Sequence, residues 1–260
     1  MRMGNPSLRR WVSKSQRGEL ETFEPATYKG VYGKSAIFGL LTLIAAIATE
    51  FTVYYLMQND LPSALIGVGI GTAVCSIVLL VMSLVIMFVP SSVKVLGMIY
   101  SVLQGDLLGC LALFVDILAV PGISLAALLG TAIVFLISLA VNKLLEVKIS
   151  SRFMRGLMVA FFSLLIVELV MWMLTAFGVI SYESSTLWWI QLAISAICVI
   201  WATIMLTWDL QNIDYLVQSG ADKKYEWNVA FSLVTTLVYL YLEILELLLR
   251  LVMLFGNKKN

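Results

Sequence analysis

Hydrophobic residues along the chain gather into seven long runs, separated by short polar segments. A helix that crosses a bilayer needs about 20 mostly apolar residues, and each run reaches that length. The alternation typical of membrane β-barrels is absent, and the runs are far longer than barrel strands. The pattern predicts an all-α membrane protein with spans near 35–57, 64–89, 93–115, 121–142, 156–180, 187–209 and 229–255.

Composition supports one membrane domain and leaves little chain for a soluble one. Apolar residues make up 61% of the sequence and charged residues 13%, whereas a soluble domain usually carries about 25% charged residues. We predict a cytoplasmic N-terminal arm over 1–34, a seven-helix domain over 35–256 and a short tail over 257–260. The first run has full span length, which argues against a cleavable signal peptide.

Basic residues are distributed unevenly between the connections. Fourteen of the 17 Lys and Arg residues lie in the N-terminal arm or in the second, fourth and sixth connections. By the positive-inside rule, those segments are cytoplasmic. Seven spans then place the C-terminus of this multi-pass protein outside.

Two local patterns refine the predicted helices. After Asp209 the apolar spacing of a helix continues as far as Val217, so the sixth helix is expected to extend beyond its apolar run until Gly220 ends it. Gly67 and Gly71 lie one helical turn apart and predict a close contact with another helix.

Acidic residues inside the apolar runs are the most informative chemical feature. An ionised carboxylate in hydrocarbon is costly unless it meets water, a cation or a polar partner. No Lys or Arg lies deep in a run, and Arg250 is the closest. Histidine is absent, so carboxylates are left as metal ligands and as pH-sensitive groups. The interior or near-interior acids are Glu50, Asp106, Glu168, Asp209, Glu243 and Glu246.

Two stretches carry a family resemblance. They are IYSVLQGDLLGCLALFVDILAVPGISLAALLGT and TWDLQNIDYLVQSGADKKYEWNVAFSLVTTLVYLYLEILELL. Both resemble the Bax inhibitor family, in particular its bacterial YccA-like branch. The N-terminal GNPSL and TYKGVYGK and the later VKISSRFMRG agree with that branch, and residues 226–245 are the most specific part.

The resemblance implies a location in a bacterial inner membrane and a seven-helix bundle with the seventh helix in the centre. It also implies a pH-sensitive Ca²⁺ leak, in which one acid late in the sixth helix and one in the seventh act as pH sensor. The matching residues here are Asp209 in WDLQN and Glu243 in LYLEIL. Both are also candidate Ca²⁺ ligands.

Two carboxylates in a poorly solvated site would share one proton, because both cannot ionise cheaply. The shared proton would hold the two helices together, and its loss would create repulsion and expose oxygens suited to Ca²⁺. Alternatively, each acid caps a helix end or faces a water-filled crevice. Asp209 and Glu243 meet only if the sixth helix extends and the seventh starts late or tilts.

Other acids are auxiliary candidates for a cation pathway. Related sequences usually have Glu-Gly where this chain has Gln104-Gly105, and Asp106 is an imperfect substitute for that Glu. Asp116 matches a position where the branch commonly has an acid. Glu246, where the branch often has a basic residue, would add negative potential beside Glu243. Glu50 and Glu168 match no family motif and either line a pore or pair with polar groups.

Three functions follow as hypotheses. The first is a pH-sensitive Ca²⁺ leak channel, with no cofactor besides the transported ion. The second is a non-conducting regulator of a membrane-bound ATP-dependent protease or of a stress response, acting through the N-terminal arm. The third, an acid-dyad protease, is disfavoured because Gly-Leu-Gly-Asp is absent, so we expect no enzyme. The expected partners are the lipid bilayer and Ca²⁺ or another cation, with a membrane protease as the partner under the second hypothesis. We expect the protein to be a monomer and to bind no nucleic acid.

Overall fold

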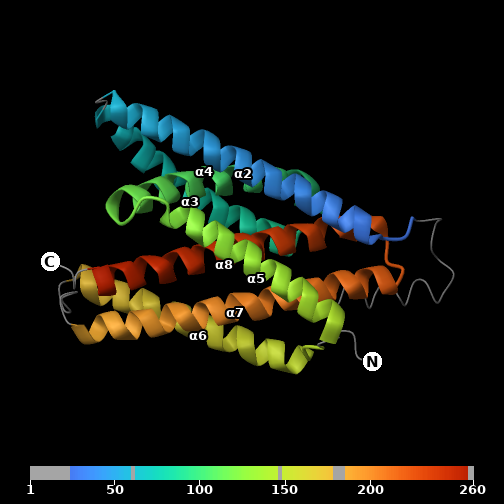
Figure 1. Ribbon diagram of the computed structural model, residues 1–260. Helices are drawn as coiled ribbons and strands as arrows, with labels where there is room; N and C mark the ends of the chain where they lie inside the picture. The colour runs from blue at the N-terminus through green and yellow to red at the C-terminus, as the bar shows by residue number, and fades with distance from the viewer. Residues whose placement is uncertain (1–23, 60–61, 146–147, 178–184, 257–260) are drawn as a thin grey trace.

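The computed structural model describes residues 24–59, 62–145, 148–177 and 185–256. Within these residues the chain forms seven α-helices, joined by short connections and two 3₁₀ turns, η1 (Pro90–Ser92) and η2 (Lys223–Tyr225) (Figure 1). The helices correspond one to one to the predicted spans. They are α2 (Tyr28–Gln58), α3 (Pro62–Phe88), α4 (Val93–Leu118), α5 (Ile123–Leu145), α6 (Ser151–Ala176), α7 (Ser185–Gln218) and α8 (Glu226–Gly256).

Two helices extend beyond their apolar runs at the same end of the bundle. α2 begins at Tyr28, within the segment assigned to the arm, because Thr27 Oγ1 accepts a hydrogen bond from Gly30 N at 3.0 Å and caps the first turn. α7 continues past Asp209 to Gln218, which confirms the predicted extension. It ends where Gly220 adopts a positive φ of 62°, a conformation that glycine adopts without steric cost.

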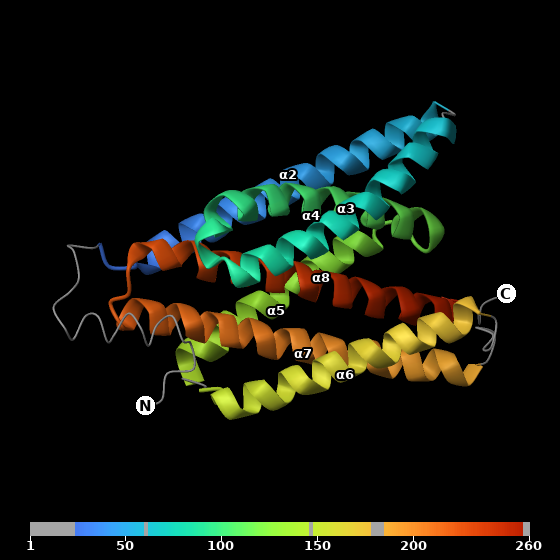
Figure 2. The same cartoon turned by 180° about the vertical axis from the view of Figure 1, so that it is seen from behind.

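The last helix, α8, lies in the centre of the bundle. It packs against α2, α4, α5 and α7, and Figures 1 and 2 show it running between the α2–α4 and α6–α7 pairs. Within its described side chains only Met253 and Phe255 are exposed. The all-α membrane bundle with a central seventh helix is therefore confirmed.

The outer helices present large apolar side chains to the outside. Exposed Leu, Ile, Val and Phe residues cover α2, α3 and α5 over most of their length. Within the residues that the structure describes, five helices contain segments long and apolar enough to cross a membrane: α2, α3, α4, α5 and α7. A surface this apolar is stable against lipid and not against water.

The contact between α2 and α4 depends on two glycines. A Cβ on Gly105 would lie closer than 3.0 Å to the carbonyl oxygen of Thr42, and a Cβ on Gly109 would do the same to that of Ala46. The missing side chains thus let the two backbones approach directly.

The predicted glycine contact on α3 is wrong. Among the described residues, a Cβ added to Gly67 or Gly71 would meet nothing within 4 Å. The four-residue glycine spacing is therefore used on α4 and is not used for close packing on α3.

A short extended segment before α2 fastens it to the connection between α7 and α8. Pro25 forms an isolated antiparallel bridge with Asp222, and Ala26 N donates to Ala221 O at 2.7 Å. Lys223 pairs with Glu24, and its ammonium group lowers the pKa of that exposed carboxyl. The bridge brings the start of α2 next to the start of α8.

Candidate functional site

Asp209 lies between α7 and α8 and is only 4% exposed. Its Oδ1 accepts a hydrogen bond from Ser232 Oγ at 2.8 Å, and its Oδ2 accepts one from Thr236 Oγ1 at 2.5 Å. Ser232 and Thr236 are one turn apart on α8, so both hydroxyls face the same carboxylate. The two bonds connect α7 to the central helix through a group that can lose its charge by protonation.

Glu243, the other predicted member of the gating pair, lies further along α8. It is seven residues beyond Thr236, which corresponds to about 10 Å along the helix axis. The hydroxyl groups that bind Asp209 therefore lie at a different position along the axis of α8 from Glu243. The side chain of Glu243 is half-buried, and its pairing with Asp209 stays a prediction.

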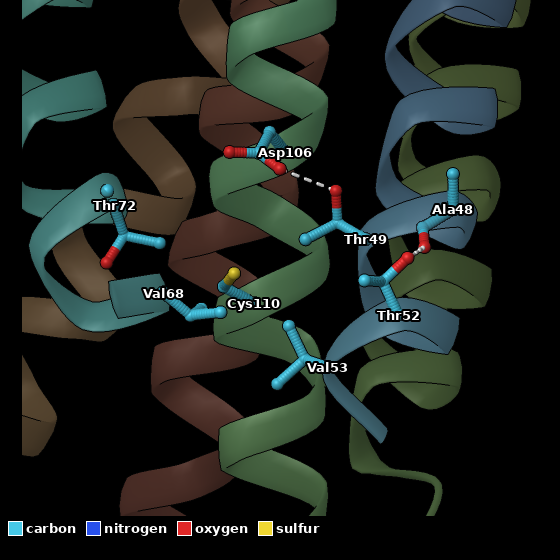
Figure 3. A pocket seen from close by; sticks show the side chains of 9 residues that line it. Ala48, Thr49, Thr52, Val53, Val68, Thr72, Asp106 and Cys110 are labelled. Carbon is cyan, nitrogen blue, oxygen red and sulfur yellow. Dashed lines mark hydrogen bonds between the residues drawn. The ribbon is translucent and has the colours of Figure 1, made fainter. Parts of the chain in front are cut away.

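Asp106 is half-buried on α4 and faces α2. Its Oδ1 accepts a hydrogen bond from Thr49 Oγ1 at 2.6 Å, and the carboxylate borders a pocket between α2, α3 and α4 (Figure 3). The pocket holds neither Asp209 nor Glu243 among the described residues that line it.

Asp116 joins the end of α4 to the start of α5. Its Oδ1 accepts from Ser124 N at 2.9 Å, and its Oδ2 accepts from Ser124 Oγ at 2.8 Å. A carboxylate in this position satisfies a free N–H group and is stabilised by the positive end of the helix dipole. Asp116 therefore caps the start of α5, and its role in a cation pathway stays a prediction.

Glu50 on α2 approaches the same region of the bundle. Tyr241 on α8 lies within electrostatic range of the carboxylates of both Asp116 and Glu50. Both roles predicted for Glu50, lining a pore or pairing with polar groups, stay predictions.

Glu246 forms an ion pair with Arg250 one turn further along α8. The guanidinium offsets the negative potential predicted for Glu246. Glu168, the remaining candidate, is on α6, and its side chain lies outside the described residues.

Glu226 is a buried acid whose importance sequence reasoning missed. It is the first residue of α8 and its side chain is 0% exposed. Its carboxylate pairs with Lys34 of α2 and accepts a hydrogen bond from Thr27 N at 2.8 Å. A Cβ on Gly30 would lie closer than 3.0 Å to that carboxylate, so the glycine makes room for it.

The cation of this pair is also held by an aromatic ring. Lys34 Nζ lies 5.1 Å from the ring centroid of Trp227, and Lys94 Nζ lies 5.8 Å from it. The only signals in the sequence were an acid at a helix start and basic residues nearby, and neither specifies a buried pair.

Asp214 is a second acid that the sequence did not single out. It lies on the extension of α7 and its Oδ2 accepts from Asn142 Nδ2 of α5 at 2.8 Å. Nearby, Gln211 Oε1 accepts from Ile149 N at 3.0 Å. These bonds fix the end of α7 against the segments around the α5–α6 connection.

In the described part of the chain, Asp209 thus forms a buried titratable connection between α7 and α8, and Glu226 forms a buried ion pair between α2 and α8. The first can change with pH through its own carboxyl group. The second fixes one end of the central helix.

Comparison with known proteins agrees with this architecture. No curated protein matches the chain. The sequence matches the family described as Bax inhibitor 1 like over residues 5–253, which includes nearly the whole chain. This multi-pass helical membrane protein belongs to the Bax inhibitor 1 like family.

Proposed function

We propose that this protein is a pH-sensitive leak pathway for Ca²⁺, gated at the contact between α7 and α8 by Asp209 together with Glu243. The observation that supports the proposal is the burial of Asp209 at that contact, where Ser232 and Thr236 of the central helix bind it. A change in its charge acts directly on the packing of the central helix.

The expected direction of the pH effect follows from charge. When Asp209 is protonated, it is neutral and the two helices stay together. When it is ionised, its charge repels an ionised Glu243. Thr236, which binds Asp209, lies about 10 Å from Glu243 along the axis of α8. Two unit charges separated by about that distance, at an effective dielectric constant of about 20, repel by on the order of 1.7 kcal/mol. That energy shifts an equilibrium between closed and open states by more than about tenfold.

The oxygens at this contact have the chemistry that a hard cation requires. Ca²⁺ binds carboxylate, carbonyl, hydroxyl and water oxygens. The contact between α7 and α8 contains one carboxylate, that of Asp209, and the two hydroxyl groups of Ser232 and Thr236. One carboxylate would hold the ion weakly, with water completing its shell, which suits a pathway rather than a storage site.

The test is Ca²⁺ flux into dye-loaded liposomes that contain the purified protein, measured across a range of pH. We expect flux to rise about tenfold as pH increases through the titration of the acids. Asp209→Asn mimics the protonated residue and should keep flux low at every pH, as should Glu243→Gln.

The control is Asp222→Asn, which alters a carboxylate in the connection before α8, where it bonds to Lys224. It should retain the wild-type pH profile. If Asp209→Asn and Glu243→Gln both leave the flux unaltered, the gating mechanism is wrong.

We further propose that the protein belongs to the YccA-like branch and is a monomer without enzymatic activity. It would lie in a bacterial inner membrane with its N-terminus in the cytoplasm. The alternative is a regulator of a membrane-bound protease that conducts nothing. In that case removing residues 1–25 should abolish co-purification of the protease, while the carboxylates are dispensable. An intact complex after truncation argues against the alternative.

A further inference from the structure

A pocket of about 290 Å³ lies between α2, α3 and α4, away from the contact between α7 and α8. Figure 3 shows Asp106, Thr49, Thr52 and Thr72 around it, with Cys110, Val53 and Val68 nearby. Gly71 of α3 also lines the pocket and is exposed. The pocket therefore combines a carboxylate and hydroxyls with apolar side chains and borders the lipid-facing surface.

The hydroxyl protons around the pocket are already used. Thr49 Oγ1 donates to Asp106 at 2.6 Å, Thr52 Oγ1 to Ala48 O at 2.7 Å, and Thr72 Oγ1 to Gly69 O at 2.9 Å. A hydroxyl has one proton to donate and two lone pairs that accept. The threonines consequently offer a ligand acceptor oxygens, which favours a ligand that donates hydrogen bonds.

The charge of the pocket selects the same kind of ligand. Asp106 lies near the middle of α4, thirteen residues after Val93, where an ionised carboxylate without a counter-charge is costly. The described residues that line the pocket include no Lys or Arg. A bound cation would supply the missing positive charge, and an anion would be repelled.

The number of carboxylates and the apolar walls narrow the class of cation. Divalent metal ions are usually held by six or more oxygens with several carboxylates, whereas this pocket has one carboxylate. Its volume corresponds to about ten water molecules at ~30 Å³ each. A primary ammonium group with a short hydrocarbon body fits both the single charge and the valine side chains.

We propose that the pocket formed by Thr49, Thr72, Asp106 and Cys110 binds a small amphiphilic amine that enters from the bilayer. The ammonium group pairs with Asp106 and donates to threonine oxygens. The hydrocarbon body packs against Val53 and Val68. This site is separate from the contact at Asp209, so it does not depend on the leak function.

The test is equilibrium binding of radiolabelled n-hexylamine to the full-length protein in nanodiscs at neutral pH, with protein-free nanodiscs as background. We expect saturable binding that unlabelled n-hexylamine displaces and that n-hexanol and hexanoate do not. Asp106→Asn should weaken binding by about tenfold or more, because a charge-assisted hydrogen bond becomes a neutral one.

A matched pair of glycine variants separates the pocket from the fold. A side chain at Gly71 or Gly69 would meet open space among the described residues, so both variants should fold. Gly71→Leu fills the pocket and should abolish binding, whereas Gly69→Leu does not line the pocket and should bind as wild type. Non-saturable uptake, equal displacement by n-hexanol, or unchanged binding in Gly71→Leu would overturn the proposal, even if Asp106→Asn failed to fold.

Discussion

Glu226→Gln should lower the free energy of unfolding by about 3 kcal/mol, because it leaves the Lys34 ammonium largely buried without its partner. The side chain of Glu226 is 0% exposed and that of Lys34 is 14% exposed. The loss should lie at the lower end of the range for a broken buried pair, because part of Lys34 still reaches solvent and the ring of Trp227 also contacts its ammonium group. Unfolding in mixed micelles with increasing SDS measures the difference.

Two controls distinguish this buried pair from surface charge. Glu24→Gln removes an exposed carboxylate that also pairs with a lysine, Lys223, and should change stability little. The double variant Glu226→Gln with Lys34→Met should recover much of the loss, because no unpaired charge is left buried. A loss in Glu226→Gln no greater than in Glu24→Gln would show that the pair does not stabilise the fold.

Gly109→Ala should destabilise the protein by about 2 kcal/mol, because its methyl group would overlap the backbone of α2. The overlap is with the carbonyl oxygen of Ala46, which cannot move away as a flexible side chain would. α2 and α4 would have to separate and lose the close contacts that hold helices together in lipid. The same SDS unfolding experiment reports the change.

Gly39→Ala is the matched control for this prediction. Gly39 lies on α2, and a Cβ there would meet nothing within 4 Å among the described residues. Alanine should therefore stabilise the helix by about 0.5–1 kcal/mol. If the two variants changed stability equally, steric overlap at Gly109 would not explain the effect.

The helices themselves were predictable because a bilayer restricts what can cross it. Backbone groups in hydrocarbon must bond within their own helix, so seven apolar runs gave seven helices. The extension of α7 was predictable from its apolar spacing, which continues beyond Asp209. The early start of α2 was not, since hydropathy marks the lipid-facing part of a helix and not the polar turns before it.

The contacts between helices were harder to predict. Glycines four residues apart occur on α3 at Gly67 and Gly71 and on α4 at Gly105 and Gly109, yet only the α4 pair meets a neighbouring backbone among the described residues. Spacing tells which residues share a face. It does not tell which face another helix covers.

The sequence alone determined the class of protein, the number of helices and the abundance of acids within them, because these depend on local composition and on the length of each run. Tertiary structure decided which partners several of these acids have, since that depends on the groups opposite them. Asp116 caps α5, Glu246 pairs with Arg250 and Glu226 pairs with Lys34. Asp209 remains between α7 and α8 with two hydroxyl partners, because helices distant in sequence meet only when the bundle has packed.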